Sequence, residues 1–238
     1  MTAQERPRTL LLFGGTGAIG GEIGSRFSTA GWRVVVVTRR EIDRPGYFCW
    51  EPLNTADAQG LDLIDRAGPF DAVCWAQGTN GNDSVYDVDL DAHLQMYRSN
   101  CLYIVASLNA LLRRDLLARP ARLCVISSIW QNISRQSKLS YGMTKAALQG
   151  LVLSAANDLG RDGHLINAVL PGALDTPMTH ANLASSQIAA LVGSTQFKRL
   201  ASLGDVASTV YFLCSEANTG VTGQFIKVDL GYSDVRIV

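Results

Sequence analysis

The stretch FGGTGAIGG at residues 13–21 follows the apolar run TLLLF and leads directly into a segment of helical periodicity. Glycines permit positive φ and let a backbone approach a pyrophosphate closely. The first turn of a helix offers free N–H groups and a partial positive charge to such an anion. Five glycines in eight residues exceed the needs of a plain turn, the alternative interpretation. We therefore predict a nucleotide site that includes Gly14, Thr16, Gly17, Ala18, Ile19 and Gly20.

The next apolar run ends just before Arg39 and Arg40, about 20 residues beyond the glycines, where an NAD-binding unit carries an acid for the ribose 2′-hydroxyl. In this chain no Asp or Glu occupies that position. Because the planar donor fork of arginine suits a phosphate, the pair predicts NADP(H) as the cofactor. Solvated surface charge is the alternative explanation for these two arginines.

Short apolar runs alternate with longer segments of helical period along the chain, a pattern typical of a parallel sheet covered by helices. It predicts a single α/β domain, residues 1–238, with a Rossmann-type doubly wound parallel sheet. We expect strands at 9–13, 33–38, 47–50, 71–75, 122–127, 165–170 and 224–228, and helices at 18–30, 57–67, 89–117, 140–160 and 204–214. Residues 179–202 are weakly periodic, so we expect a mobile loop with one or two short helices there.

Composition excludes several classes of function. The 21 basic and 21 acidic residues cancel, so no net field would draw the chain to nucleic acid or to an anionic membrane. No apolar run reaches the roughly 18 residues of a membrane span. The five cysteines are well separated, which favours buried thiols in a reducing compartment over disulfides or metal ligands. We expect a cytoplasmic protein with a small-molecule substrate and no metal.

Tyr141 and Lys145 stand four residues apart, hence on one face of the helix expected at 140–160. A neighbouring cation favours a phenolate, so this spacing predicts a lowered pKa for Tyr141 and a role as general acid/base. Ser128 closes a strand thirteen residues upstream, which brings a hydroxyl to the same edge of the sheet. Taken singly, a Tyr–Lys pair also arises by chance, and a serine at a strand end often bonds its own backbone.

These motifs coincide in order with three others: Asn100 in the long expected helix, PGALDT at 171–176 after a strand, and TGQ at 222–224 followed by VDLG at 228–231. In this combination the chain resembles the short-chain dehydrogenase/reductase family from residue 10 to about residue 232. The resemblance implies that Tyr141 exchanges the alcohol proton and that Lys145 lowers its pKa and binds the nicotinamide ribose. It further implies that Ser128 orients the carbonyl and that Asn100 holds a water.

The resemblance also implies the surroundings of the reaction. Ala76 and Gln77 after the fourth strand, and Pro171, Gly172, Leu174 and Thr176 after the sixth, are expected to contact the cofactor together with Tyr141 and Lys145. We expect Trp130, Gln131 and Met178 to line the substrate cavity. Similar proteins assemble through the helices at 89–117 and 140–160, which predicts a homodimer or homotetramer.

Three features depart from the family's short branch. The spacing G-x-x-G-x-x-G is that of the sugar-nucleotide branch, the sequence Cys74-Trp75-Ala76-Gln77 keeps only the alanine of the usual motif, and no aspartate follows the third strand, where Glu51 is nearest. We predict an NADP(H)-dependent oxidoreductase that interconverts a carbonyl and a secondary alcohol in a ketone, 3-oxoacyl or sugar-type substrate. The alternatives are a non-catalytic NADP(H)-sensing protein and a sugar-nucleotide epimerase or dehydratase.

Overall fold

The computed structural model describes residues 6–54 and 57–235. In this part of the chain, seven parallel strands form one sheet in the order β3-β2-β1-β4-β5-β6-β7. The order reverses between β1 and β4, and ligands of such sheets bind outside the carboxyl ends of the strands at this point. The predicted doubly wound fold is confirmed. The strands are β1 (Thr9–Phe13), β2 (Arg33–Thr38), β3 (Tyr47–Cys49), β4 (Phe70–Trp75), β5 (Leu117–Ile126), β6 (Leu165–Pro171) and β7 (Phe225–Val228).

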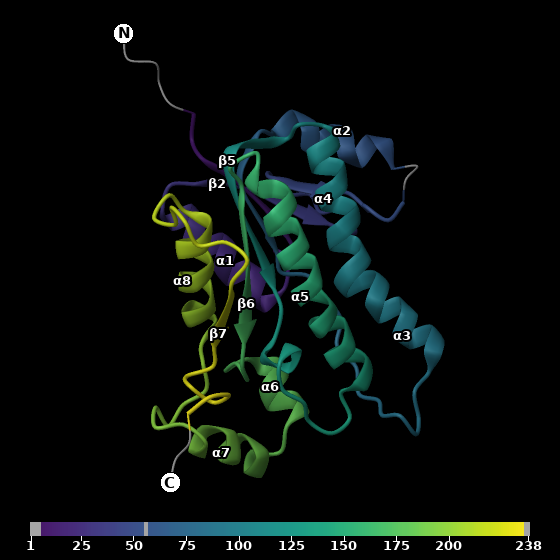
Figure 1. Ribbon diagram of the computed structural model, residues 1–238, viewed down its shortest axis with the longest axis vertical. Coiled ribbons are helices and arrows are strands. Elements are labelled where there is room, and N and C mark those ends of the chain that lie inside the picture. The colour runs from purple at the N-terminus through teal and green to yellow at the C-terminus, as the bar shows by residue number, and fades with distance from the viewer. Residues whose placement is uncertain (1–5, 55–56, 236–238) are drawn as a thin grey trace.

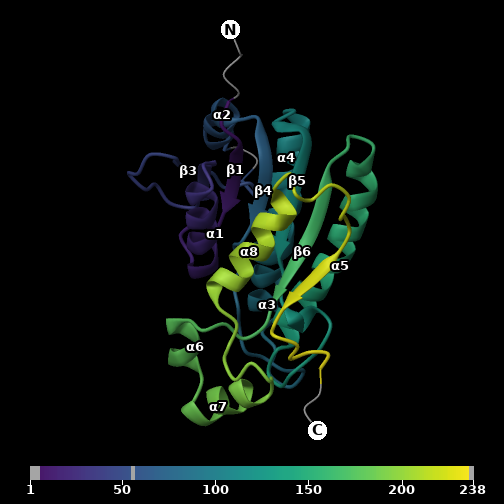
Figure 2. The ribbon, with the colours of Figure 1, turned by 90° about the vertical axis from the view of Figure 1, so that its left-hand side faces the viewer.

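Helices cover both faces of the sheet (Figure 1). One face carries α1 and α8, and the other carries α2, α4 and α5, while α6 and α7 lie beyond the carboxyl ends of the strands (Figure 2). The short helices α6 and α7 occupy the weakly periodic segment, as the sequence predicts. The helices are α1 (Ala18–Thr29), α2 (Ala58–Ala67), α3 (Leu90–Tyr97), α4 (Tyr103–Arg113), α5 (Leu139–Gly160), α6 (Pro177–Asn182), α7 (Ser185–Gly193) and α8 (Leu203–Cys214).

The central strands are buried on both faces, which explains their continuous apolar runs. In β1, Leu11 and Phe13 point into the core under α2, α4 and α5, whereas Leu10 and Leu12 point into the core under α1 and α8. Trp75, at the end of β4, is fully buried and its indole N–H donates to Ser107 Oγ at 2.8 Å. The unusual tryptophan of the Cys74-Trp75-Ala76-Gln77 stretch therefore anchors α4 to the sheet.

The helix expected at 89–117 forms as one uninterrupted helical segment, but its hydrogen-bond register changes within it and it is shorter than expected. It consists of α3, a π-helical turn at Arg98–Leu102 and α4, and it ends at Arg113. A turn with Asp115 at φ +52° follows, and β5 begins at Leu117, five residues before the expected start at residue 122. The charged residues Arg114 and Arg119 break the apolar pattern there, which conceals the start of the strand from a reading of the sequence.

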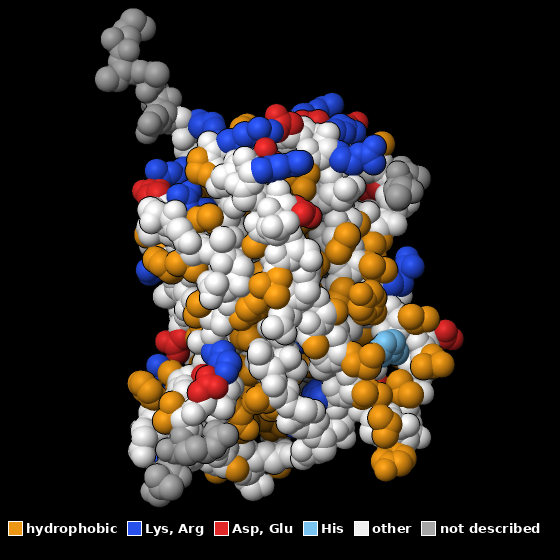
Figure 3. All heavy atoms as spheres, in the orientation of Figure 1, with side chains coloured by type: hydrophobic (Ala, Val, Ile, Leu, Met, Phe, Trp, Pro, Cys, Tyr) orange, Lys and Arg blue, Asp and Glu red, His pale blue; other side chains and the backbone are white. Residues whose placement is uncertain are grey.

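Apolar side chains remain exposed along α3, α4 and α5 (Figure 3). Leu94, Leu102 and Val105 are 57%, 38% and 50% exposed, and Met143 and Leu153 on α5 are about equally open. An apolar surface of this kind is typical of an interaction face. No helix among the described residues has both the length and the apolar character needed to cross a membrane.

Candidate active site

The glycine turn packs directly against the end of β4. Gly14 has φ +77°, and a Cβ on it would lie 2.5 Å from the backbone nitrogen of Gln77. Gly20, in the first turn of α1, is packed against the carbonyl of Gly14. Gly17 caps α1 without a side-chain hydrogen bond, so no side chain occupies the N–H groups of the first turn. The loop thus leaves room and donors for an anion.

A cavity of about 510 Å³ opens at the carboxyl ends of β1, β2 and β4. Its wall includes six of the predicted cofactor residues: Gly14, Thr16, Gly17, Arg39, Ala76 and Gln77. Arg40 is exposed and does not line it. The wall also includes residues to which sequence reasoning gave no cofactor role, among them Glu51, Leu53, Gln95, Arg98, Ser99 and Tyr103. Four of these come from α3, the π-helical turn and α4, which only the fold brings beside the glycines.

The side chain of Gln77 tests whether the cavity fits a polar ligand. Both amide atoms of its side chain are buried, and neither has a hydrogen-bond partner among the described residues. A buried unpaired polar group costs about 1–3 kcal/mol. The glycine cradle, the uncapped helix start and this amide fit a dinucleotide with a phosphate and a polar nicotinamide or ribose portion. Gln77 departs from the family's usual motif after the fourth strand, but its side chain is compatible with a bound cofactor.

Ser128, Tyr141 and Lys145 lie together at the carboxyl end of β5, as the sequence predicts. The hydroxyl of Ser128 lies within hydrogen-bond reach of the Tyr141 phenol, and Lys145 Nζ lies 5.6 Å from the centre of the Tyr141 ring. Lys145 is 5% exposed and donates to the carbonyl of Ile126 at 3.0 Å. This group of a hydroxyl, a phenol and an ammonium adjoins the cavity, because Gly78 of the cavity wall lies beside Lys145 Nζ.

The expected net lowering of the Tyr141 pKa is wrong. Burial raises the pKa of Tyr141, and the hydrogen bond from Ser128 opposes this only in part. Burial also lowers the pKa of Lys145 to about 8. The i, i+4 spacing indicates that Tyr141 and Lys145 share a helix face, but it does not indicate that both side chains are buried.

Asn100 lies in the π-helical turn and is 1% exposed. Its Oδ1 accepts from the Thr79 amide at 2.7 Å, and its Nδ2 donates to the Thr79 carbonyl at 3.0 Å and to Thr144 Oγ1 at 2.9 Å. It therefore ties the segment after β4 to α5, one residue before Lys145. A π-helical turn often occurs at a functional site because it re-aims a side chain within a helix.

The predicted substrate residues follow Ser128 in a short 3₁₀ turn. Trp130 is half-buried and its amide donates to Ser128 Oγ at 3.3 Å. Gln131 is buried; its Oε1 accepts from Ser127, while its Nε2 has no partner among the described residues. Met178 belongs to α6, but its side chain lies outside the described residues.

The turn after β6 lies at the same end of the sheet. Pro171 ends β6, and a Cβ on Gly172 would lie 2.7 Å from Asp229 Cβ, so the turn packs tightly against the segment after β7. Leu174 is buried and pairs with Ala201. Thr176 caps α6 by accepting from the amide of Thr179 at 3.2 Å.

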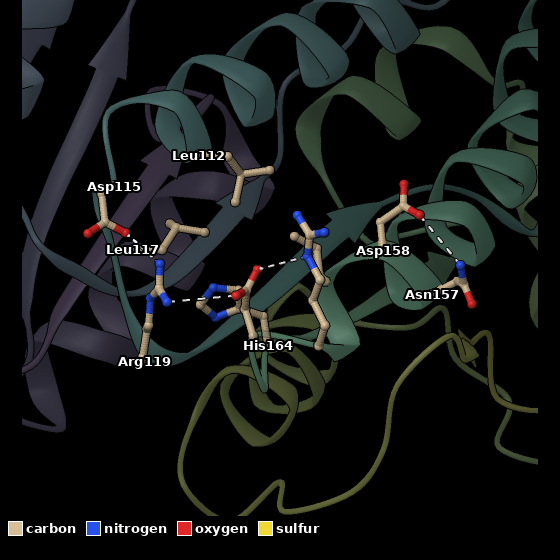
Figure 4. A pocket seen from close by; sticks show the side chains of 10 residues that line it. Leu112, Asp115, Leu117, Arg119, Asn157, Asp158 and His164 are labelled. Atoms are coloured by element: carbon tan, nitrogen blue, oxygen red, sulfur yellow. Dashed lines mark hydrogen bonds and ion pairs between the residues drawn. The ribbon is translucent and has the colours of Figure 1, made fainter.

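A second cavity, of about 670 Å³, lies at the opposite end of the sheet (Figure 4). Several of its charges pair with one another: Arg119 contacts Asp115 at 2.9 Å and Asp162 at 3.7 Å. His164 Nδ1 accepts from the Ala121 amide at 2.9 Å. None of the predicted site residues lines this cavity. In residues 6–54 and 57–235, no group of three or more His, Cys, Asp or Glu side chains is arranged to hold a metal ion.

Comparison with known proteins places the chain in a family. The family model described as "Enoyl-(Acyl carrier protein) reductase" matches residues 56–233. The uncharacterized oxidoreductase YmfI of Bacillus subtilis is 24% identical over 240 residues, which cover 94% of this chain and 98% of that protein. The 3-oxoacyl-[acyl-carrier-protein] reductase FabG of Pseudomonas aeruginosa is 33% identical over 132 residues, 56% of this chain and 52% of that protein.

Solved structures agree on the fold. The gluconate 5-dehydrogenase from Burkholderia cenocepacia, in complex with NADP and tartrate, has a TM-score of 0.87 at 20% identity and covers 96% of both chains. ElxO with NADP bound has a TM-score of 0.84 at 21% identity and covers 97% of this chain and 100% of that one. With the family match and the conserved architecture in agreement, the chain belongs to the short-chain dehydrogenase/reductase family of oxidoreductases.

Proposed function

We propose that the protein is an NADP(H)-dependent oxidoreductase that interconverts a carbonyl and a secondary alcohol, with Ser128, Tyr141, Lys145 and Asn100 as its reacting site. One observation carries the proposal: Gly78 belongs to the wall of the glycine-lined cavity and also lies beside Lys145 Nζ and Asn100 Oδ1. A cofactor in the cavity and a substrate at Tyr141 would therefore meet at this point.

Arg39 supports the preference for the 2′-phosphate of NADP(H). It follows β2 and lines the cavity, and it forms no ion pair among the described residues. The acid nearest to it in the wall, Glu51, accepts from the amide of Leu53 at 3.3 Å. An unpaired guanidinium at this place suits a phosphate better than a ribose hydroxyl. The NADP-bound neighbours ElxO and gluconate 5-dehydrogenase are similar in fold.

The reduction needs a hydride and a proton, and a reduced nicotinamide, when bound in the cavity, would supply the hydride. The Tyr141 hydroxyl donates its proton to the carbonyl oxygen, while the Ser128 hydroxyl donates a hydrogen bond that orients the same oxygen. As Tyr141 loses its proton, the Lys145 ammonium at 5.6 Å from the ring stabilises the phenolate. Asn100 holds the segment after β4 against α5 and so keeps Lys145 in place.

The exposed apolar side chains of α3, α4 and α5 support assembly into a homodimer or homotetramer through these helices (Figure 3).

The proposed substrate class includes ketones, 3-oxoacyl thioesters and sugar-type carbonyl compounds. A relative named as a 3-oxoacyl reductase and a structural neighbour named as a gluconate dehydrogenase represent the thioester and sugar-type classes. The fold has one sheet and no second domain among the described residues, which disfavours the sugar-nucleotide epimerase or dehydratase.

The test is a titration of the purified protein with NADPH and NADH, followed by the fluorescence of the bound cofactor. A panel of ketones, 3-oxoacyl thioesters and keto sugars is then supplied with the preferred cofactor. We expect tighter binding of NADPH and its oxidation by at least one panel member. Binding without turnover across the panel would favour the NADP(H)-sensing alternative, and binding of neither cofactor would contradict the proposal.

A further inference from the structure

The first turn of α5 has no cap of its own. The helix begins at Leu139, and the side chain of Lys138 before it forms no capping hydrogen bond. The first N–H groups of a helix have no partner within the helix, and helix ends fray. Tyr141 lies in this turn, so its position depends on what the rest of the chain supplies to these amides.

Asp83, in the loop between β4 and α3 (residues 76–89), supplies the missing cap. Its carbonyl accepts from the amide of Leu139 at 3.2 Å, and its Oδ1 accepts from the amide of Ser140 at 3.0 Å. Its Oδ2 accepts from the Ser140 hydroxyl. The helix dipole also favours a carboxylate at this place. Both oxygens of one carboxylate thus hold the residue directly before Tyr141.

His93 of α3 contacts the same serine. Its Nδ1 lies 2.8 Å from Ser140 Oγ. The hydroxyl donates its single hydrogen to Asp83, because a carboxylate only accepts. Ser140 Oγ therefore accepts from His93, which assigns the ring hydrogen to Nδ1. In this His93–Ser140–Asp83 network the serine is central and fully buried, unlike a hydrolytic triad, in which the histidine is central.

The loop between β4 and α3 also holds Lys138. The ammonium of Lys138 donates to Asn80 Oδ1 at 2.7 Å and to the Gly81 carbonyl at 2.8 Å. It lies 5.5 Å from the centre of the Tyr141 ring. The loop therefore contacts each of the three residues that precede Tyr141.

Lys145, one turn further along α5, is held independently of this loop. It donates to the carbonyl of Ile126, on β5, at 3.0 Å. None of the three residues of the network lines the cofactor cavity. Loss of the network should therefore displace the phenol of Tyr141, while Lys145 and the wall of the cavity stay in place.

We propose that His93 and Asp83 are positioning residues of the reaction, which act through Ser140 to hold the phenol of Tyr141 against Ser128. The proposal rests on the proposed function, because it takes Tyr141 as the proton donor. The Ser128 hydroxyl lies within hydrogen-bond reach of the phenol. A small displacement of a reacting group from its productive geometry lowers the rate steeply. The effect is therefore expected in kcat and not in cofactor affinity.

The kinetic test compares variants that remove the hydrogen bonds with variants that keep them. In Ser140→Ala and His93→Leu, kcat should fall about tenfold, while KM and the dissociation constant of NADPH stay within about twofold of wild type. His93→Asn, whose Nδ2 can donate in place of the ring nitrogen, should retain most of the wild-type kcat.

Asp87→Asn is the matched control in the same loop, where we expect kcat to be unchanged. Asp87 accepts from the amide and from the hydroxyl of Ser84, both at 2.6 Å, and it forms no hydrogen bond to α5 among the described residues. A loss of kcat in Asp87→Asn equal to that in Ser140→Ala would contradict the specific role of the network.

A spectroscopic measurement makes the test independent of turnover. In protein labelled at the histidine nitrogens and at the tyrosine Cζ, the neutral ring of His93 should carry its hydrogen on Nδ1. Ser140→Ala should shift the resonances of both His93 Nδ1 and Tyr141 Cζ, and Asp87→Asn should shift neither. A shift at His93 without one at Tyr141 would overturn the proposal, because the network would then not position the phenol.

Three kinetic outcomes would also overturn it: an unchanged kcat in Ser140→Ala, equal losses in His93→Asn and His93→Leu, or a loss of NADPH affinity in parallel with kcat. Failure of the proposed function is distinguishable from these, because neither NADPH nor NADH would then bind to the wild-type protein.

Discussion

The two ends of the sheet carry cavities of similar size but opposite chemistry. At the carboxyl ends the wall of the cavity of about 510 Å³ includes Gln77, whose two side-chain amide atoms are buried without a hydrogen-bond partner among the described residues. At the amino ends the cavity is larger, about 670 Å³, but Arg119 and Arg161 both contact Asp162, at 3.7 and 3.6 Å. Buried polar groups in proteins are nearly always hydrogen-bonded. Unmet hydrogen-bonding capacity at Gln77, and not volume, therefore distinguishes the cavity at the carboxyl ends from the one at the amino ends.

Removing the hydroxyl of Tyr141 should have the largest effect on turnover of all the changes predicted here. No equal effect is expected from a change in the cavity at the amino ends of the strands. In Tyr141→Phe the reacting oxygen loses its proton donor, so kcat should fall by about 10²–10⁴-fold. The dissociation constant of NADPH should stay within about twofold of wild type, since the ring remains. Steady-state kinetics and fluorescence titration measure these two quantities.

The matched control is Arg119→Gln in the cavity at the amino ends, where we expect kcat and the NADPH affinity to be unchanged. A Tyr141→Phe variant that retained substantial turnover would remove Tyr141 from the proposed role. A loss of turnover in Arg119→Gln equal to that of Tyr141→Phe would contradict the distinction between the two ends.

The parts that the sequence predicts well are those in which local pattern and burial agree. The strands Thr9–Phe13 and Arg33–Thr38 have the expected bounds, because strands buried on both faces are continuous apolar runs. The glycine turn is equally predictable from the sequence, because the close approach of Gly14 to the backbone of Gln77 tolerates no larger residue. The positions of Ser128 and Tyr141 are also predictable from the sequence, because each residue lies where a strand ends or a helix begins.

The parts that the sequence does not predict depend on distant contacts. The π-helical turn exists where Asn100 bonds Thr79, twenty-one residues away, and no periodicity signals it. Arg98 lines the cofactor cavity because α3 folds across the end of β4, far from the glycines in the sequence. The pKa of Tyr141 depends on burial, which the i, i+4 spacing of a tyrosine and a lysine does not encode.

A second prediction tests which of the two adjacent arginines, Arg39 or Arg40, binds the 2′-phosphate of NADPH. Arg39 lines the cavity and Arg40 does not, so Arg39→Ala should weaken NADPH binding about tenfold and NADH binding far less. Arg40→Ala is the matched control and should change both affinities by less than about twofold. Fluorescence titration with the two cofactors measures the ratio. Equal losses of NADPH and NADH in Arg39→Ala would place the 2′-phosphate elsewhere.

The last prediction concerns stability, and it compares a buried base at each end of the sheet. The folded pKa of Lys145 is lowered to about 8 from its unfolded value of 10.5. Between these values the unfolded chain binds the proton and the folded chain does not, so the contribution of Lys145 to stability rises with pH. Relative to Lys145→Met, the wild-type free energy of unfolding should rise between about pH 8 and 10, by at most on the order of 1.4 kcal/mol per pH unit. Urea unfolding of both proteins across this range measures the difference.

His164, at the amino ends, provides the contrast in a different window. Burial lowers its pKa below 6.5, so its contribution to stability is full above pH 6.5 and is lost as the pH falls toward the folded pKa. The difference between wild type and His164→Gln should therefore vary with pH only below about 6.5, whereas that between wild type and Lys145→Met should vary only above about 8. If the difference for Lys145→Met were flat from pH 8 to 10, the Lys145 ammonium would be solvated in the folded protein. It would then be free to leave Tyr141, and the proposed stabilisation of the phenolate would fail.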